Sequence, residues 1–206
     1  RELAFLNAGI RIEFNDLRGE EPVNKVYHYE GGYSLIEMVN SDRILVVPRG
    51  QPVPKGLDDD IVVVQQPLQD IYLAATSAMA LFESIDPTDS ISFVGSKHWY
   101  TDRAARALET GEFVYAGKYN APDYELLLNG GCQLAIESTM ILHNPEVKEK
   151  MIELGIKTVV ERSSYEPHPL GRTEWIKLYA AMLGKEDVAE AFFDETVRLI
   201  EEYAGY

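Results

Sequence analysis

Short, continuously apolar runs alternate with helical stretches along most of this 206-residue sequence, and that alternation constrains the fold more than any other feature. Each run leads through a polar loop into a segment whose apolar residues recur every three or four positions, the spacing of a helix with one buried face. We expect pairs of a strand and a following helix at 61–64 and 71–85, 91–94 and 101–109, 113–116 and 123–128, 134–136 and 144–154, and 158–160 and 173–183. This repeat predicts an α/β domain, a parallel sheet between two layers of helices.

The sequence before this region has the pattern of antiparallel strands. Apolar or alternating runs, two of them separated by a Glu-Gly-Gly turn, lie at 10–14, 24–29, 33–38 and 43–47. Short runs joined by glycine-containing turns are typical of hairpins. The last run ends at a segment rich in proline and glycine, 48–56. We therefore expect an N-terminal antiparallel β extension over residues 1–56 and an α/β domain over residues 57–184.

The chain is acidic, with 19 Lys and Arg against 34 Asp and Glu, a net charge of −15 and an isoelectric point near 4.6. An unspecific nucleic-acid binder needs a basic surface that displaces counterions from phosphates, so the charge argues against that class. Hydrophobic residues make up 46% of the chain, enough for a folded core rather than a disordered acidic tail. No apolar run approaches the roughly 20 residues that cross a bilayer, so we expect no membrane-spanning helix.

A long amphipathic helix is expected at 185–206. Val188, Phe192 and Leu199 share one side of it, while seven acidic residues against two basic ones make the remainder strongly polar. A helix of this length, with a rise of about 1.5 Å per residue, can run along a whole small domain.

The loops that follow the parallel strands are the expected place for a site, because ligands bind at the carboxyl ends of such strands. Trp99-Tyr100, Lys118-Tyr119 and Tyr165 lie in three of these loops, and loop aromatics offer flat apolar faces with polar rims. Each aromatic could equally cover its own loop. Arg162 and Arg172 could hold an anionic ligand, or pair with neighbouring glutamates and stabilise the loop instead.

Other chemistries have less support in the sequence. Ser163 or Ser164 with His168 would suggest a hydrolase, but the Gly-x-Ser-x-Gly pattern is absent. The histidines, including His98 and His168, lack the spacing of a metal site, and no glycine-rich phosphate loop follows a strand. Cys132 is the only cysteine, which excludes an internal disulfide. We therefore predict no enzymatic activity, no metal-ligating residues and no cofactor.

Two stretches of the sequence resemble a known family. They are residues 122–128, Pro-Asp-Tyr-Glu-Leu-Leu-Leu, and residues 132–138, Cys-Gln-Leu-Ala-Ile-Glu-Ser. Together they are similar to the N-x-E-x-I … K-P-D-L-V-I stretch of substrate-binding proteins of ABC importers for iron-siderophores, haem and cobalamin. A clostridial-type branch of iron-complex binding proteins resembles the runs 43–48, 60–72 and 169–177. The resemblance covers nearly all of the chain after about residue 40. The sequence departs from it at 131–133, Gly-Cys-Gln in place of Lys-Pro-Asp, and in the N-terminal extension.

The resemblance implies a bilobed protein in which two α/β lobes are joined by one rigid helix and hold the ligand between them. Residues 185–206 match the joining helix, so the sequence corresponds to the N-terminal lobe with its linker and lacks the second lobe. Glu125 falls on the position where the family's N-terminal lobe docks onto arginines of the membrane permease. The family's ligand-binding loops correspond here to Gln66, Pro67, Trp99, Tyr100, Lys118, Tyr119, Ser138, Thr139, Ser163, Tyr165 and Arg172.

The predicted function is that of a monomeric, extracytoplasmic receptor, anchored to lipid through a removed N-terminal segment. It would bind a small-molecule metal chelate and deliver it to the transmembrane subunits of an ABC permease. A ferric siderophore is the leading candidate for this chelate. Two alternatives remain open. A receptor for bare zinc or manganese ions needs three or four convergent His, Asp or Glu ligands, which the sequence does not reveal. An unrelated α/β enzyme or interaction module could share the fold, since fold alone does not fix function.

Overall fold

A computed structural model describes residues 8–13, 24–38, 42–86, 90–166 and 169–204. Its contacts divide the chain into two compact units, Arg1–Leu68 and Gln69–Tyr206, so the division falls after the expected boundary at residue 56. The mixture of helices and parallel strands agrees with the predicted α/β class.

The N-terminal unit is a five-stranded sheet with its strands in sequence order. Its strands are β1 (Ala8–Glu13), β2 (Asn24–Tyr29), β3 (Ser34–Met38), β4 (Arg43–Val47) and β5 (Ile61–Gln65). The first four pair antiparallel, as expected, whereas β5 pairs parallel to β4. The strands described within residues 1–56 are thus antiparallel, as expected, whereas the run at 61–64, predicted as the first strand of the α/β domain, completes this sheet instead. Arg43 of β4 holds the segment that leads into β5, because its guanidinium binds the carboxylates of Asp58 and Asp60 at 2.9 and 2.6 Å.

The second unit contains a parallel sheet of five strands in the order β12-β11-β6-β7-β8. These strands are β6 (Ile71–Leu73), β7 (Ile91–Val94), β8 (Val114–Tyr115), β11 (Leu134–Ser138) and β12 (Lys157–Glu161). A small antiparallel hairpin, β9 (Gly117–Lys118) with β10 (Ala121–Pro122), follows β8. In sequence the chain builds outward from β6 in one direction and then returns to add β11 and β12 on the other side. The order therefore reverses between β6 and β11.

The helices lie where they are predicted, with two differences: the first is shorter at its start, and the fifth begins at Pro169 instead of 173, so Arg172 lies on that helix and not in the loop before it. They are α1 (Met79–Ile85), α2 (Asp102–Thr110), α3 (Tyr124–Asn129), α4 (Pro145–Glu153), α5 (Pro169–Leu183) and α6 (Glu186–Ala204), with short 3₁₀ turns η1 (Glu30–Gly32), η2 (Thr76–Ala78), η3 (Thr139–His143) and η4 (Ser163–Tyr165). The single helix expected at 71–85 was wrong, since its first residues form β6. A three-residue apolar strand cannot be told from the start of a buried helix by periodicity.

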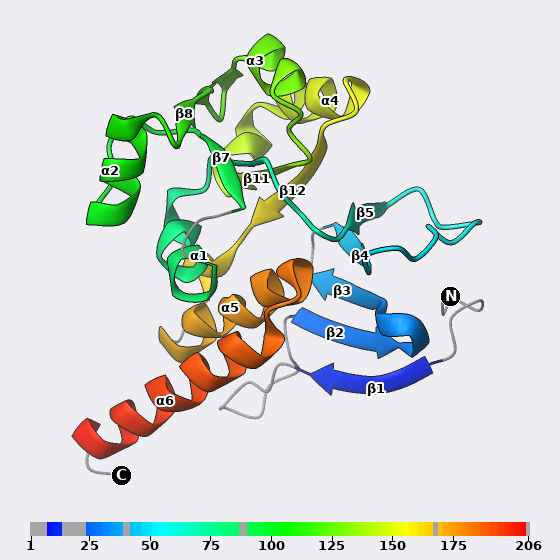
Figure 1. The fold of residues 1–206 in the computed structure, drawn as a ribbon, viewed down its shortest axis with the longest axis vertical. Coiled ribbons are helices and arrows are strands. Elements are labelled where there is room, and N and C mark those ends of the chain that lie inside the picture. The colour runs from blue at the N-terminus through cyan, green and yellow to red at the C-terminus, as the bar shows by residue number, and fades with distance from the viewer. Residues whose placement is uncertain (1–7, 14–23, 39–41, 87–89, 167–168, 205–206) are drawn as a thin grey trace. The chain divides into compact units, whose positions relative to one another are not determined.

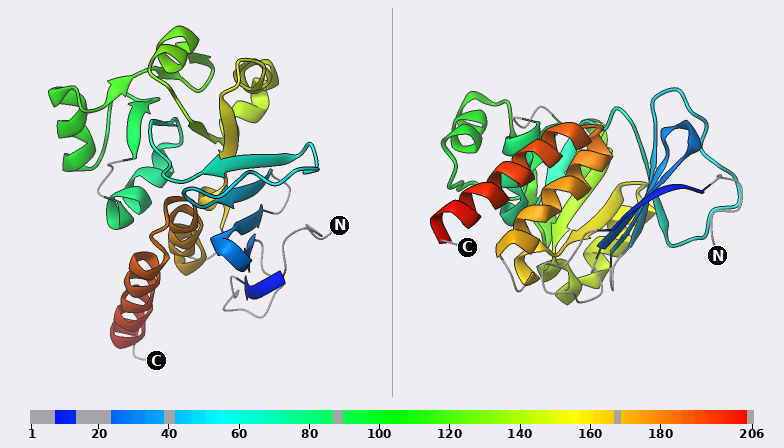
Figure 2. Two further views of the ribbon diagram at one scale, coloured as in Figure 1. Left: turned by 45° about the vertical axis from the view of Figure 1, so that its right-hand side comes forward. Right: turned by 90° about the horizontal axis from the view of Figure 1, so that it is seen from below.

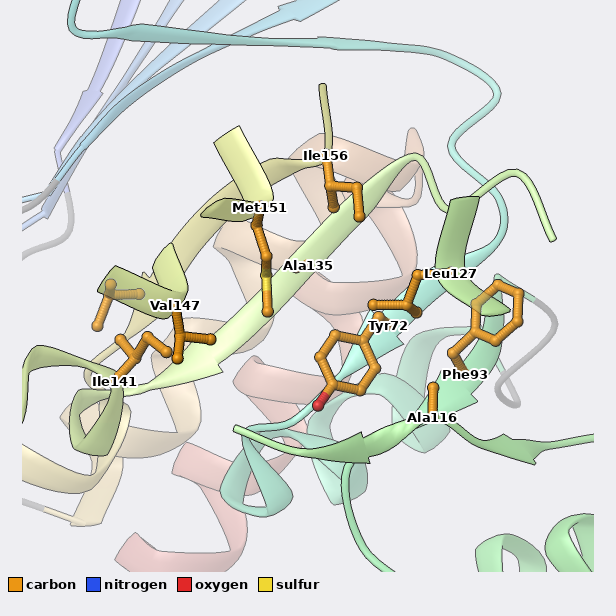
Figure 3. Packing of buried hydrophobic residues seen from close by; sticks show 10 residues of the cluster. Tyr72, Phe93, Ala116, Leu127, Ala135, Ile141, Val147, Met151 and Ile156 are labelled. Carbon is orange, nitrogen blue, oxygen red and sulfur yellow. The ribbon is translucent and has the colours of Figure 1, made fainter. Parts of the chain in front are cut away.

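Two layers of helices enclose the parallel sheet, as Figures 1 and 2 show. Side chains on one face of the sheet, Tyr72 and Ala135 among them, pack with Leu127 of α3 and Met151 of α4 in the cluster drawn in Figure 3. Because side chains alternate along a strand, the flanking residues of β6 and β11 point to the opposite face, beneath α1 and α5. There the rings of Phe82 and Tyr179 lie 4.6 Å apart between their centroids.

The last helix, α6, lies along α5 in both views of Figure 2. Its buried residues Ala189 and Phe193 make this contact, and the Lys177 ammonium of α5 lies 4.1 Å from the centre of the Phe193 ring. Val188 and Phe192 are more exposed, at 46% and 40%. None of the helices in the described parts of the chain combines the length and the apolar character needed to cross a membrane.

Candidate functional site

A pocket of about 880 Å³ lies at the carboxyl edge of the parallel sheet. All five strand-to-helix loops contribute to it, and its floor includes residues after β6 and β11, the two strands between which the strand order reverses. Open α/β sheets bind ligands at this topological position. The lining residues are Ala74, Thr76, Ser77, Gly95, Ser96, Lys97, His98, Tyr115, Lys118, Tyr119, Ser138, Thr139, Met140, Ser164 and Tyr165.

The loop after β7 is braced by hydrogen bonds within itself. The Ser96 hydroxyl donates to the His98 carbonyl oxygen at 2.8 Å, and the Trp99 indole donates to the Ser96 carbonyl oxygen at 3.0 Å. Gly95 allows this loop to approach β6 closely, since a Cβ there would lie 2.8 Å from the Ala74 Cα. The braced loop carries Lys97 and His98 on the pocket side.

The segment after β8 supplies the second wall. Tyr115, Lys118 and Tyr119 line the pocket from β8 and the following hairpin. Gly117 makes this hairpin possible, with a φ of +85° and no room for a Cβ beside the Ala121 carbonyl oxygen. The Lys97 ammonium lies 4.6 Å from the centre of the Tyr115 ring, so the walls after β7 and β8 meet through a cation–π contact.

The remaining walls, η2, η3 and η4, are tied together by two sets of hydrogen bonds. The buried carboxylate of Glu161 accepts from the Ser77 hydroxyl at 2.6 Å and from the Ser163 amide at 2.6 Å, which links η2 to η4. Near the rim, the Thr139 hydroxyl donates to the Tyr165 phenol oxygen at 3.0 Å, linking η3 to η4. The pocket therefore has a fixed back and an exposed aromatic rim.

Glu137 lies directly before Ser138 but on the other face of β11. It is fully buried and neither carboxylate oxygen has a hydrogen-bond partner. Burial raises the pKa of Glu137 from 4.5 to about 8, so the group is protonated in the fold at neutral pH. The phenols of Tyr72 and Tyr124 lie close enough for the acid to contribute to their raised pKa values, after their own burial.

Five of the predicted ligand-binding residues line the pocket: Lys118, Tyr119, Ser138, Thr139 and Tyr165. They come from three different loops, which the topology brings to one edge of the sheet.

The other predicted residues do not line this pocket. Trp99 is half-buried over its own loop and Tyr100 is fully exposed. Ser163 is buried behind the pocket, with its amide held by Glu161, and Arg172 is exposed and donates to the Ser164 hydroxyl at 3.3 Å. Gln66 and Pro67 belong to the N-terminal unit and do not follow a strand of the parallel sheet, because the strand before that helix is β6. Glu125 is exposed on α3 and is not among the lining residues.

Sequence reasoning missed the residues that follow β6 and those next to the selected aromatics. Thr76 and Ser77 were assigned to the interior of a helix, whereas they follow a strand and form η2. Lys97 and His98 lie in a loop that the sequence identified, but the neighbouring aromatics were preferred over them. Selecting the basic residues of these loops, which stand out in an acidic chain, would have identified Lys97.

The described residues also bear on direct metal binding. Among them, His, Cys, Asp and Glu side chains form no group of three or more that could hold a metal ion. The alternative of a bare-ion receptor has no candidate ligand set in those parts of the chain. His168 lies outside the described residues.

Solved structures with a similar fold include solute-binding proteins. A periplasmic haem-binding protein from Pseudomonas aeruginosa matches with a TM-score of 0.53, 18% identity, 66% of this chain and 46% of that chain. The siderophore-binding protein FeuA from Bacillus subtilis, complexed with ferri-bacillibactin, matches with a TM-score of 0.50, 19% identity, 68% of this chain and 46% of that chain. The molybdate-binding protein MolA from Haemophilus influenzae matches with a TM-score of 0.50, 15% identity, 66% of this chain and 49% of that chain. Each match covers about two thirds of this chain and less than half of the other chain, so the chain shares the fold of about half of such a binding protein, in agreement with the α/β fold that the resemblance implied.

Two uncharacterised lipoproteins of Methanocaldococcus jannaschii are similar in sequence. MJ0878 is 26% identical over 87% of this chain and 49% of its own length, and MJ0872 is 24% identical over 93% of this chain and 50% of its own length. The chain thus spans about half the length of these relatives. A stretch of 45 residues is also 53% identical to part of a DNA gyrase protein of Staphylococcus aureus, 21% of this chain but 7% of that protein. No protein-family model matches the chain.

Proposed function

We propose that this chain serves as an extracytoplasmic solute receptor, which binds a bulky metal chelate without transforming it and passes it to the permease of an ABC importer. A ferric siderophore is the first candidate. The observation that carries the proposal is the pocket of about 880 Å³ to which all five strand-to-helix loops contribute.

The size and the lining of the pocket support this class of ligand. Pockets for small molecules and cofactors enclose about 300–1,000 Å³, and the volume here falls in the upper part of that range. Tyr115, Tyr119 and Tyr165 offer flat faces for an organic ligand, while hydroxyls from η2 and η3 offer hydrogen bonds. The names of the similar solved structures, for haem, a ferric siderophore and molybdate, agree with such a role. The lipoprotein relatives favour a location outside the cytoplasm.

Glu125 is the proposed contact to the permease. It is exposed in the first turn of α3, and Asp123 caps that helix by accepting from the Leu126 amide at 2.9 Å. An exposed acid held on a capped helix can form a charge-assisted hydrogen bond to an arginine of a partner. Replacing Glu125 by Gln should leave chelate affinity unchanged and weaken stimulation of the importer's ATPase in proteoliposomes.

The test of receptor function is a titration of the full chain with ferric hydroxamate, ferric catecholate, ferric citrate, haem and cobalamin, followed by intrinsic fluorescence and calorimetry. Trp99 is held in the loop after β7 by its bond to the Ser96 carbonyl, next to lining residues, so a bound chelate should quench its emission. Tyr119→Ala should weaken binding, because its ring lines the pocket. Tyr100→Ala is the matched control, since that ring is fully exposed and outside the pocket.

Saturable binding of one chelate, weakened by Tyr119→Ala and not by Tyr100→Ala, would support the proposal. Folded protein that responds to none of the five would contradict the chelate-receptor proposal and favour the unrelated α/β module.

A further inference from the structure

The charge of the pocket is opposite to that of the chain. The protein carries a net charge of −15, yet the pocket is lined by Lys97, Lys118 and His98 and by no Asp or Glu. Within the described part of the chain, no carboxylate forms an ion pair with either lysine. Other described lysines of this unit, such as Lys150 and Lys177, lie next to a glutamate. The two lysines share one cavity that has no acidic lining residue, so an anionic ligand can supply their counter-charge.

The geometry directs one of these charges to the pocket. The Lys97 ammonium is held 4.6 Å from the centre of the Tyr115 ring, and both residues line the cavity. A cation over an aromatic face keeps its donor hydrogens free for a ligand on the other side. Lys118 lines the pocket from the hairpin that follows β8, on β9. A ligand that fills the pocket therefore meets a cavity lined by both lysines.

Two hydroxyl groups of the pocket keep a proton for a ligand. Thr139 donates its proton to the Tyr165 phenol oxygen, which leaves the phenol proton of Tyr165 available to a ligand. Ser164 accepts from Arg172, so its own proton is available in the same way. Ser77, Ser96 and Thr139 instead give their protons to the Glu161 carboxylate, the His98 carbonyl oxygen and the Tyr165 phenol oxygen. Ammonium groups and free O–H groups together favour a ligand rich in hydrogen-bond acceptors and negative charge.

We infer that the pocket selects anionic, oxygen-rich ligands, and that Lys97 and Lys118 are its specificity-determining residues. This inference rests on the proposed function and narrows it: among ferric chelates, the pocket favours catecholate or carboxylate complexes, which carry net negative charge, over neutral hydroxamate complexes. Ferric ion bound by three catecholates is a trianion, whereas ferric ion bound by three hydroxamates is neutral. The two complexes therefore contain the same metal ion and differ in net charge.

The experiment titrates the full chain and three variants, Lys97→Gln, Lys118→Gln and Lys150→Gln, with a ferric tris-catecholate, a neutral ferric tris-hydroxamate and molybdate. Lys150 lies on the exposed surface of α4, paired with Glu153 at 3.2 Å, so its variant makes the same charge change away from the pocket. We expect the wild type to prefer the catecholate. Each pocket variant should bind it about tenfold more weakly, as for a lost charge-assisted hydrogen bond. Hydroxamate binding should change less than about threefold. Added salt should weaken binding of the two anionic probes, the catecholate and molybdate, and leave hydroxamate binding nearly unchanged.

The outcomes separate this inference from the proposed function. Binding of the neutral hydroxamate as tightly as the catecholate would overturn the selectivity, even though the receptor proposal would stand. A loss in Lys150→Gln equal to that in the pocket variants would trace the effect to overall charge and overturn the assignment to Lys97 and Lys118. Binding of molybdate alone, weakened by both pocket variants, would support anion selection while contradicting a chelate as cargo. Folded protein that binds none of the three probes would overturn both.

Discussion

Replacement of Glu137 by Gln should remove a pH-dependent penalty on folding. The Glu137 side chain is fully buried in the second unit, and both of its carboxylate oxygens lack hydrogen bonds. The strand neighbour on the same face, Ala135, belongs to the apolar cluster of Figure 3. The titratable groups that face the acid are the phenols of Tyr72 and Tyr124. Neither supplies a positive charge, so burial dominates and favours the neutral acid.

The sign and size of the effect follow from proton linkage. The pKa of Glu137 is about 8 in the fold against 4.5 for an ordinary glutamate. Between these values the unfolded chain has lost the proton and the folded chain retains it, so stability falls as the pH rises. Each pH unit in this window costs about 1.4 kcal/mol. From about pH 5.5 to about pH 7.5 the free energy of unfolding of the wild type should fall by about 3 kcal/mol relative to that of Glu137→Gln.

The measurement is urea unfolding of both proteins at several pH values in this window. The window also stays above the isoelectric point near 4.6, where the uncharged chain would be least soluble. Tryptophan fluorescence reports on unfolding of the second unit, which contains Glu137, because the two tryptophans of the chain, Trp99 and Trp175, both lie within Gln69–Tyr206.

Glu149→Gln is the matched control. Glu149 is exposed on α4, so its carboxylate keeps its water in the folded state and its replacement should leave the pH profile unchanged. Parallel profiles for Glu137→Gln and the wild type would refute the reasoning. They would mean that Glu137 is ionised inside the fold and that some group stabilises the buried charge.

Three further predictions concern local structure. Gly95→Ala should destabilise the second unit by about 1–3 kcal/mol in urea unfolding and weaken any ligand, because the new Cβ meets the Ala74 Cα at 2.8 Å. Asp123→Ala should cost about 1 kcal/mol, since it removes the cap of α3; unchanged stability would mean that the bond to the Leu126 amide contributes nothing. Burial raises the pKa of the Cys132 thiol to about 11, so iodoacetamide should alkylate it slowly at pH 8 in the folded protein and rapidly in urea; equal rates would contradict that burial.

The sequence predicts most helices because they are long enough to show their period. Residues 101–109 and 144–154 were expected as helices and are α2 and α4, within one or two residues at each end. The strand β6 was missed because three apolar residues, Ile71–Leu73, carry no period of their own and lead directly into a helix. A pairing partner decides such cases, and β6 has one on each side, β11 and β7. Strand pairing is a property of the fold and is not visible in the segment itself.

The missed strand β6 also explains why Gln66 and Pro67 were predicted as ligand-binding residues although they do not line the pocket. Once 61–64 was taken as the first parallel strand, Gln66 and Pro67 became the first ligand loop, and the residues that do line the pocket there, Thr76 and Ser77, were placed inside a helix. The loops after the correctly placed strands β8 and β11 gave Lys118, Tyr119, Ser138 and Thr139, which do line it. Within a correct loop, the direction of each side chain still depends on local bonds. Trp99 is an example, because its indole bonds to its own loop.

The position of the pocket and the identity of its ligand have different physical origins. The position follows from the strand order, because the reversal between β6 and β11 leaves the carboxyl edge open there. The lining side chains lie beyond the strand ends, and residues such as Lys97, Lys118 and Tyr165 are exposed and take no part in the core. Their identity can change without cost to packing, so similar folds can bind haem, a ferric siderophore or molybdate. Ligand class must therefore be argued from the charges that line the pocket, which in this chain are those of Lys97 and Lys118.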